Sequence, residues 1–309
     1  MKTDFTMNLI SILFCLLTST MIIYSSLINL FEPKLPHILS QIFRFGKFGA
    51  KAKSKLVMEV PKSWFKHFYI CAFIEFTYLI WLVTMVYLFH MKVPSYVRFL
   101  LDCLCGTERI AFVPKHKVFI ATCLMTIQVY RRLYDTQKIS VFGNNSKLNL
   151  THYVIGLIHY PGVILAILSE APLFANSPST IAEAPINLLS TTLSDKIAVL
   201  IFWLAWKHQF ICTKILANLR KDKNGNTVNS EYKLPQGDWF DYLTAPHQTT
   251  EIVMYCCITW ILWSNITWFF IFTWVLANQI ETILLSHWWY QEKFEDFPKT
   301  RKALIPFLY

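Results

Sequence analysis

Seven apolar segments constrain the fold of this chain more than any other feature of its sequence. A membrane-spanning helix needs about 20 consecutive, mostly apolar residues. Segments of that kind occupy roughly residues 8–30, 67–90, 116–134, 152–171, 195–217, 248–264 and 266–287. The last two meet near Ser264–Asn265, so six long spans are an alternative. The pattern predicts an all-α polytopic membrane protein with about seven transmembrane helices.

The charged residues indicate how the chain is oriented. They make up only 16% of the 309 residues, against about 25% in soluble domains. Of the 29 lysines and arginines, twenty fall in segments on one side of the predicted spans and five on the other. Because cytosolic loops carry the excess of basic residues, we expect a lumenal N-terminus and a cytosolic C-terminus. The net charge of +10 is spread between spans, which argues against a nucleic-acid partner.

Polar side chains recur at helical spacing near the cytosolic ends of the last three spans. Ionisable groups are rare in spans and usually face a protein interior or cavity. The three stripes are Lys207, Lys214 and Asn218, with His208 and Arg220 nearby; His247, Glu251 and Tyr255; and Gln279, Thr282, Ser286 and Tyr290, with His287 beside them. Taken singly, such residues are often snorkelling or helix-pairing groups. Together they predict a cytosol-facing polar pocket for an anionic ligand, with Lys299 and Arg301 of the tail close to it.

Other motifs narrow the choice of ligand and add candidates. The chain has eight glycines and neither GxGxxG nor GxxxxGK[ST], so a Rossmann or P-loop nucleotide site is unsupported. The eight cysteines have no CxxC or zinc-like spacing, so we expect no metal site. Gln128, Arg131 and Tyr134 lie near one face at the end of the third span. Glu75, in the middle of the second span, is either a buried carboxyl or a functional one.

Two sets of motifs resemble the steroid 5-alpha-reductase family. The first set is the tail WYQEKFEDFPKTRKALIPFLY (289–309), the segment YKLPQGDWFDY (232–242) after Leu219–Arg220, and the helix start APH (245–247) followed by Glu251. A second set resembles the polyprenol reductase branch of the family. Its motifs are VPKSWFKHFY (60–69), RRLY (131–134), SVFG (140–143) and HQF (208–210). Together the motifs extend over nearly the whole chain after the first span.

The resemblance implies a reductase of the endoplasmic reticulum membrane that uses NADPH without a Rossmann fold. We therefore expect residues 1–66 to hold an anchor and a basic cytosolic loop, and residues 67–309 a reductase domain of about six helices. Expected cofactor contacts are Lys207, His208, Asn218, Arg220, Tyr232, His247, Glu251, His287, Tyr290 and Arg301. The family usually has asparagine at the position of His247.

The resemblance leaves the general acid open. The steroid enzymes polarise the substrate carbonyl with a glutamate and a tyrosine, and the position of that tyrosine corresponds here to Val129. Candidate catalytic residues are therefore Glu75, Gln128, Arg131 and Tyr134.

The implied reaction is NADPH-dependent reduction of the alpha-isoprene double bond of polyprenol or polyprenal, in the dolichol synthesis that supports protein N-glycosylation. An allylic alcohol cannot delocalise the charge of an incoming hydride, so we favour the aldehyde. Expected partners are a long-chain isoprenoid and membrane lipid, with no obligatory protein partner evident. Alternatives are reduction of 3-oxo-4-ene steroids or of 2-enoyl-CoA thioesters, and a non-enzymatic lipid-binding scaffold.

Overall fold

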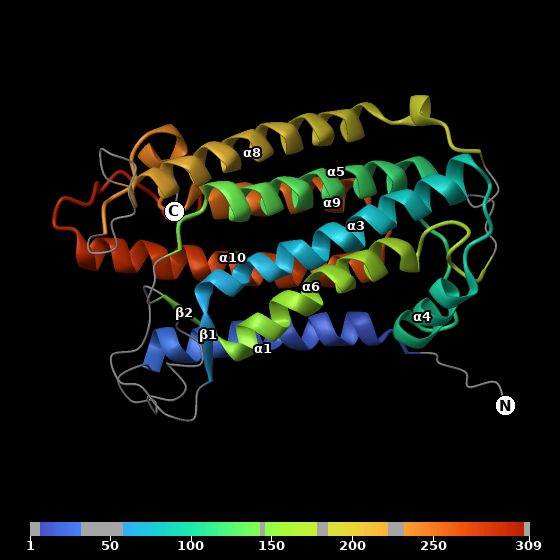
Figure 1. Ribbon diagram of the computed structural model, residues 1–309, viewed down its shortest axis with the longest axis horizontal. Helices are drawn as coiled ribbons and strands as arrows, with labels where there is room; N and C mark the ends of the chain where they lie inside the picture. The colour runs from blue at the N-terminus through green and yellow to red at the C-terminus, as the bar shows by residue number, and fades with distance from the viewer. Residues whose placement is uncertain (1–6, 32–57, 143–145, 178–184, 222–231, 306–309) are drawn as a thin grey trace.

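The protein is an antiparallel bundle of long helices (Figure 1). The computed structural model describes residues 7–31, 58–142, 146–177, 185–221 and 232–305. The long helices are α1 (Leu9–Phe31), α3 (Phe65–Leu88), α5 (Lys115–Tyr134), α6 (Leu150–Ser169), α8 (Leu193–Asn218), α9 (Pro246–Ile261) and α10 (Ile266–Lys293). Shorter elements are α4 (Ser95–Cys105) and the two-stranded sheet of β1 (Glu59–Pro61) and β2 (Lys147–Asn149). The prediction of an all-α polytopic membrane protein is confirmed.

Each predicted span overlaps one long helix. By length and composition, five segments in the described ranges could cross a membrane: α1, residues 62–88 including α3, α6, α8 and α10. The helices α5 and α9 lie among them in the bundle. Because α9 ends at Ile261 and α10 begins at Ile266, the last two predicted spans are separate helices. That all seven helices cross the bilayer stays a prediction.

Successive long helices run in opposite directions (Figure 1). The ends of α1, α5, α8 and α10 therefore meet the starts of α3, α6 and α9 at one end of the bundle, where the described chain also ends. The basic segments of the sequence begin at these helix ends, although most of the predicted loop 31–66 lies outside the described residues. The assignment of this end to the cytosol stays a prediction.

The opposite end of the bundle is held by helix caps. The first N–H groups of a helix have no partner within it. The carboxylate of Glu170, just after α6, accepts bonds from the backbone N–H groups of Ile266 (3.0 Å) and Thr267 (2.9 Å). The Asn265 side chain accepts from the N–H of Trp268 at 2.7 Å and donates to the carbonyl of Ala166 at 2.8 Å. These bonds fix the start of α10 against α6.

The outer surface of the bundle is apolar. Large exposed side chains include Leu16, Ile74, Trp81, Leu200, Trp263 and Ile266. Many exposed apolar side chains on one protein mark contact with lipid or with another protein, and here they lie on or beside helices long enough to span a bilayer. Inside the bundle, Gly162 of α6 lets the ring of Phe14 approach, because a Cβ at Gly162 would overlap that ring.

Two local structures shape the end of the bundle where the described residues end. β1 pairs antiparallel with β2, and the N–H of Lys62 donates to the carbonyl of Ser146 at 2.9 Å. This pairing fixes Lys62 at the start of the 3₁₀ turn that leads into α3. The tail after α10 folds back, because Lys302 donates to the carbonyl of Tyr242 and accepts from the N–H of Thr244, both at 2.9 Å.

Candidate functional site

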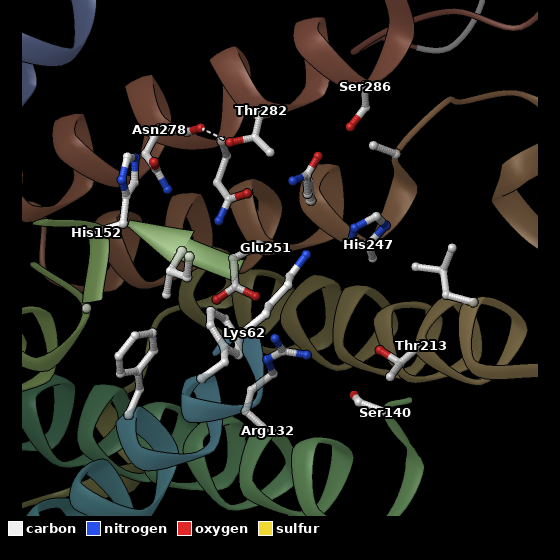
Figure 2. Close-up of a pocket in the computed structure, with 18 of the residues that line it drawn as sticks. Lys62, Arg132, Ser140, His152, Thr213, His247, Glu251, Asn278, Thr282 and Ser286 are labelled. Carbon is white, nitrogen blue, oxygen red and sulfur yellow. Dashed lines mark hydrogen bonds between the residues drawn. The ribbon is translucent and has the colours of Figure 1, made fainter. Parts of the chain in front are cut away.

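A cavity of about 840 Å³ lies among the helices at this end of the bundle (Figure 2). Its lining comes from α1, α3, α5, α6, α8, α9 and α10 and from segments that follow α5 and α8. The volume falls within the range of roughly 300–1,000 Å³ that is usual for ligand and cofactor pockets. In Figure 2, Lys62 and Arg132 project into it on one side, with Glu251 and His247 of α9 facing them and Asn278, Thr282 and Ser286 on α10 beyond.

Glu251 is held in one conformation by two buried amides. Gln209 of α8 donates from Nε2 to the Glu251 carboxylate and to the carbonyl of His247, the latter at 2.9 Å. Gln128 of α5 donates from Nε2 to Glu251 Oε2 at 3.2 Å and to Gln209 Oε1 at 2.9 Å. The two glutamine side chains are buried. Because buried polar groups are costly unless satisfied, this network ties α5, α8 and α9 together.

Arg131 extends this network away from the cavity. Its guanidinium donates to Asp135 Oδ2 (2.9 Å), to Gln128 Oε1 (2.9 Å) and to Gln209 Oε1. Arg131 and Asp135 are both buried. Its positive charge is therefore compensated within the protein, and its position serves to orient the two glutamines.

Arg132 and Lys62 bring positive charge into the cavity. Arg132 donates from Nε (3.1 Å) and Nη2 (3.0 Å) to the Tyr69 hydroxyl, and its charge lies close enough to Glu251 to interact. The ammonium of Lys62 has no hydrogen-bond or ion-pair partner among the described side chains, and it lies near enough to Arg220 to be repelled. Two neighbouring cations with spare donors favour an anionic ligand such as a phosphate.

The outer part of the cavity is formed by Arg220, Tyr232 and Tyr290. Arg220, just after α8, donates to the carbonyl of Val141 at 3.3 Å. The ring of Tyr290 stacks on Phe294 (centroids 5.8 Å apart) and on Phe297 (6.4 Å). The Arg301 guanidinium lies 5.6 Å from the Phe297 ring centroid and donates to the carbonyl of Pro235 at 3.0 Å. Burial lowers the pKa of Arg301. The ring contacts with Phe294 and Phe297 of the folded-back tail position Tyr290.

Much of the inner lining of the cavity is apolar. Leu17 and Met21 of α1, Phe68 of α3 and Trp274 and Val275 of α10 line it. Gly156 of α6 is required there, because a Cβ at this position would lie 2.7 Å from Phe68 Cε2. The cavity therefore combines a cationic outer part with a largely apolar inner part.

The candidate catalytic residues are distributed unevenly. Gln128 and Arg131 belong to the network behind Glu251, although neither side chain lines the cavity. Glu75 lies on α3 outside the cavity lining, and its Oε2 is buried without a hydrogen-bond partner among the described residues. Tyr134 is 53% exposed and its ring contacts Phe210. The structure does not bring these four side chains to one point.

The candidate cofactor residues divide into two groups. Those that line the cavity are Arg220, Tyr232, His247, Glu251 and Tyr290. Those outside the lining are Lys207, His208, Asn218, His287 and Arg301. Lys207 and Asn218 are exposed. His208 bonds to Asp238 at 2.9 Å and stacks on Trp239, and His287 bonds to the Thr244 hydroxyl at 2.6 Å. Several of these residues outside the lining hold together the segments that surround the cavity.

The lining residues that were not among the candidates include Lys62, Tyr69, Arg132 and Gln209. All four lie in motifs that carried the family resemblance, VPKSWFKHFY, RRLY and HQF. The family resemblance could therefore have identified these four residues as candidates. Helical spacing could not, because Lys62 precedes its helix and Arg132 differs from Arg131 by only one position. Among the described residues, no cluster of three or more His, Cys, Asp or Glu side chains could hold a metal ion.

Comparison with known proteins yields a consistent group of relatives. The model of the 3-oxo-5-alpha-steroid 4-dehydrogenase family matches residues 182–309. The chain is 35% identical to a polyprenal reductase of Drosophila melanogaster, over 97% of this chain and 93% of that protein. It is 30% identical to polyprenal reductases of Homo sapiens, over 88% and 86%, and of Caenorhabditis elegans, over 95% of each.

Proposed function

Because this chain belongs to the steroid 5-alpha-reductase family, we propose that it is a polyprenal reductase. The reaction is reduction of the carbon–carbon double bond next to the aldehyde of a long-chain isoprenoid, with NADPH as the reductant. We place this activity in the endoplasmic reticulum membrane, as a step of dolichol synthesis for protein N-glycosylation. The chain acts there without an obligatory protein partner.

The observation that carries the proposal is the two-part cavity. Its outer part presents Lys62, Arg132 and Arg220. The ammonium of Lys62, which has no partner among the described side chains, fits a phosphate-bearing cofactor. When bound, NADPH supplies a hydride. The protein's part is to hold the cofactor's phosphates with these cations and to fix Glu251 through Gln128 and Gln209.

The inner part of the cavity suits a lipid. Leu17 and Met21 of α1 line it together with Trp274 of α10, and these helices are long and apolar enough to cross a bilayer. An isoprenoid chain can therefore remain in an apolar environment while its polar head enters the cavity. The aldehyde is the better acceptor, because its carbonyl takes up the electron pair that the hydride displaces.

A substrate panel tests the proposal. The purified chain in lipid nanodiscs is supplied with NADPH or NADH and with polyprenal, polyprenol, a 3-oxo-4-ene steroid or a 2-enoyl-CoA. We expect turnover of polyprenal with NADPH. Turnover of only the steroid or the thioester would assign the chain to the other enzymes of the family. A folded protein without turnover and without thermal stabilisation by NADPH would support a scaffold.

A matched pair of variants tests the cofactor site. Arg220→Met removes a cation that lines the cavity just after α8, and Lys207→Met removes an exposed cation from the middle of α8. A hydrogen bond to a charged group contributes about 1.5–3 kcal/mol. Arg220→Met should therefore raise the KM for NADPH roughly 10–100-fold, while Lys207→Met leaves it unchanged. Equal KM values for NADPH in the two variants would show that Arg220 does not contact the cofactor.

A further inference from the structure

A tyrosine and a histidine form a buried pair in the cavity, apart from the amides that hold Glu251. Tyr255 lies on α9, four residues and therefore one turn beyond Glu251, so both side chains project from the same face. Its hydroxyl is 3.0 Å from Nε2 of His159 on α6. Both residues line the cavity, and Tyr255 is only 3% exposed.

The Tyr255 ring is held in one position. It stacks on Trp268 of α10, with centroids 5.8 Å apart and planes inclined by 11°. Trp268 is fully buried, and its Nε1 donates to the Thr259 hydroxyl at 2.9 Å. Three helices, α6, α9 and α10, therefore determine where the phenol oxygen lies. A donor fixed in this way loses little freedom when a substrate binds.

The direction of the bond between His159 and Tyr255 follows from the other ring nitrogen. Nδ1 of His159 is buried and has no hydrogen-bond partner among the described residues. A buried N–H without an acceptor is rarer than an unused acceptor, so we assign the proton of the neutral imidazole to Nε2. Nε2–H then donates to the Tyr255 oxygen. The hydroxyl hydrogen of Tyr255 is left free to donate to a group in the cavity.

We propose that Tyr255 donates a hydrogen bond and then a proton to the carbonyl oxygen of the substrate, and that His159 is the positioning residue that orients its hydroxyl. This inference rests on the proposed function. Tyr255 would supply the proton donor that this chain lacks at the position of the family's tyrosine. That position is occupied by Val129, which is apolar and fully buried.

Bound NADPH would supply a hydride to the β carbon (C3) of the enal and be oxidised to NADP⁺, while the electron pair of the C2=C3 bond forms a C1=C2 bond. The C1=O pair moves to oxygen, which takes the proton of Tyr255 and becomes an enol. The Tyr255 oxygen, now negative, is stabilised by the N–H of His159 and is reprotonated by water. Water then protonates the enol at C2 and takes up the O–H proton, which yields the saturated aldehyde.

Other cavity groups are less suited to this role. The Glu251 carboxylate accepts bonds from two amides and has no proton to give while ionised. Arg132 directs two of its N–H groups to Tyr69. Tyr69 and Tyr160 also line the cavity and are the rivals that an experiment has to exclude.

The test uses the full chain in nanodiscs, polyprenal and NADPH. Tyr255→Phe should lower kcat about 10²–10³-fold, as loss of one oxyanion donor does, while the KM for NADPH and thermal stabilisation by NADPH stay unchanged. Tyr69→Phe and Tyr160→Phe should each keep kcat within about tenfold, the effect of one ordinary hydrogen bond. Tyr87→Phe is the matched control, because it deletes a buried hydroxyl that donates to the carbonyl of Pro172, outside the cavity lining.

The role of His159 has its own readout. His159→Leu removes the donor and should lower kcat roughly tenfold at unchanged KM for NADPH, since one hydrogen bond to a developing charge is lost. His159→Gln keeps an N–H donor and should restore most of kcat. Identical kcat values for His159→Leu and the wild type would contradict the positioning role, and this pair decides the question if Tyr255→Phe fails to fold.

The outcomes separate the two proposals. Wild-type protein without polyprenal turnover would overturn the proposed function and this inference together. An active wild type with a Tyr255→Phe variant that keeps kcat within threefold would overturn this inference alone. A large kcat loss in Tyr69→Phe or Tyr160→Phe, with none in Tyr255→Phe, would assign the donor to that tyrosine.

Discussion

Replacing Gln209 by leucine should destabilise the protein more than any other single amide substitution at the cavity. The Gln209 side chain bonds to Gln128, Arg131, Glu251 and the carbonyl of His247, and it is 2% exposed. Leucine has a similar volume, so the substitution leaves no large void. The decrease in the free energy of unfolding therefore comes from the lost hydrogen bonds.

The magnitude follows from the partners. Two of the lost bonds join charged groups and contribute about 1.5–3 kcal/mol each. The carbonyl of His247 keeps a second donor, the Thr250 hydroxyl at 3.0 Å, and Arg131 keeps Asp135. The free energy of unfolding should fall by roughly 3–5 kcal/mol, which corresponds to a decrease in Tm of about 6–10 °C.

Thermal unfolding of the purified chain, followed by tryptophan fluorescence, measures this decrease. Gln291→Leu is the control, because Gln291 is exposed and bonds only to His287 among the described residues; its Tm should change by less than about 1 °C. Combining Gln128→Leu with Gln209→Leu should cost about 1–2 kcal/mol less than the sum of the two single changes, since the pair shares one network. A Tm for Gln209→Leu within 1 °C of the wild type would refute the assignment of this network as a stabilising unit.

Three further predictions concern the rest of the fold. Gly162→Ala should lower stability by about 1–3 kcal/mol, because the added methyl group overlaps the buried ring of Phe14; a Tm equal to that of the wild type would contradict the close packing of α1 and α6. Glu170→Ala should lower stability by about 1–3 kcal/mol, since the first N–H groups of α10 lose their acceptor, whereas Glu292→Ala in the last turn of α10 should have little effect. In sealed microsomes, a C-terminal tag should be digested by added protease and an N-terminal tag protected, and the reverse pattern would invert the predicted topology.

The positions of the helices were predictable because the bilayer requires a run of about 20 apolar residues from each spanning helix. All seven predicted spans overlap helices, and their boundaries mostly agree within two or three residues. The main exception is α10, which continues to Lys293, beyond the predicted end at residue 287. Apolarity ends there, but the aromatic residues that follow pack against the folded-back tail and prolong the helix.

The site was predictable in part. Helical spacing placed Glu251 and Tyr255 on one face of α9, and Thr282, Ser286 and Tyr290 on one face of α10, and all five line the cavity. The same spacing also selected Lys207, which is exposed. Periodicity defines which residues of one helix share a face, but not which neighbouring helix or solvent that face meets. The choice between Arg131 and Arg132 depended on the rotation of α5 against α8 and α9, which no local pattern encodes.

The amino-acid sequence by itself determined that the chain forms a helical membrane protein, and its motifs determined the family to which it belongs. Both properties are encoded by local sequence, the first by the length of the apolar runs and the second by contiguous motifs. The tertiary structure decided which polar groups meet: Gln128 with Gln209 and Glu251, the tail with the segment before α9, and His159 with Tyr255, 96 positions apart in the chain. Such contacts depend on the packing angles of whole helices, which arise from many side chains acting together.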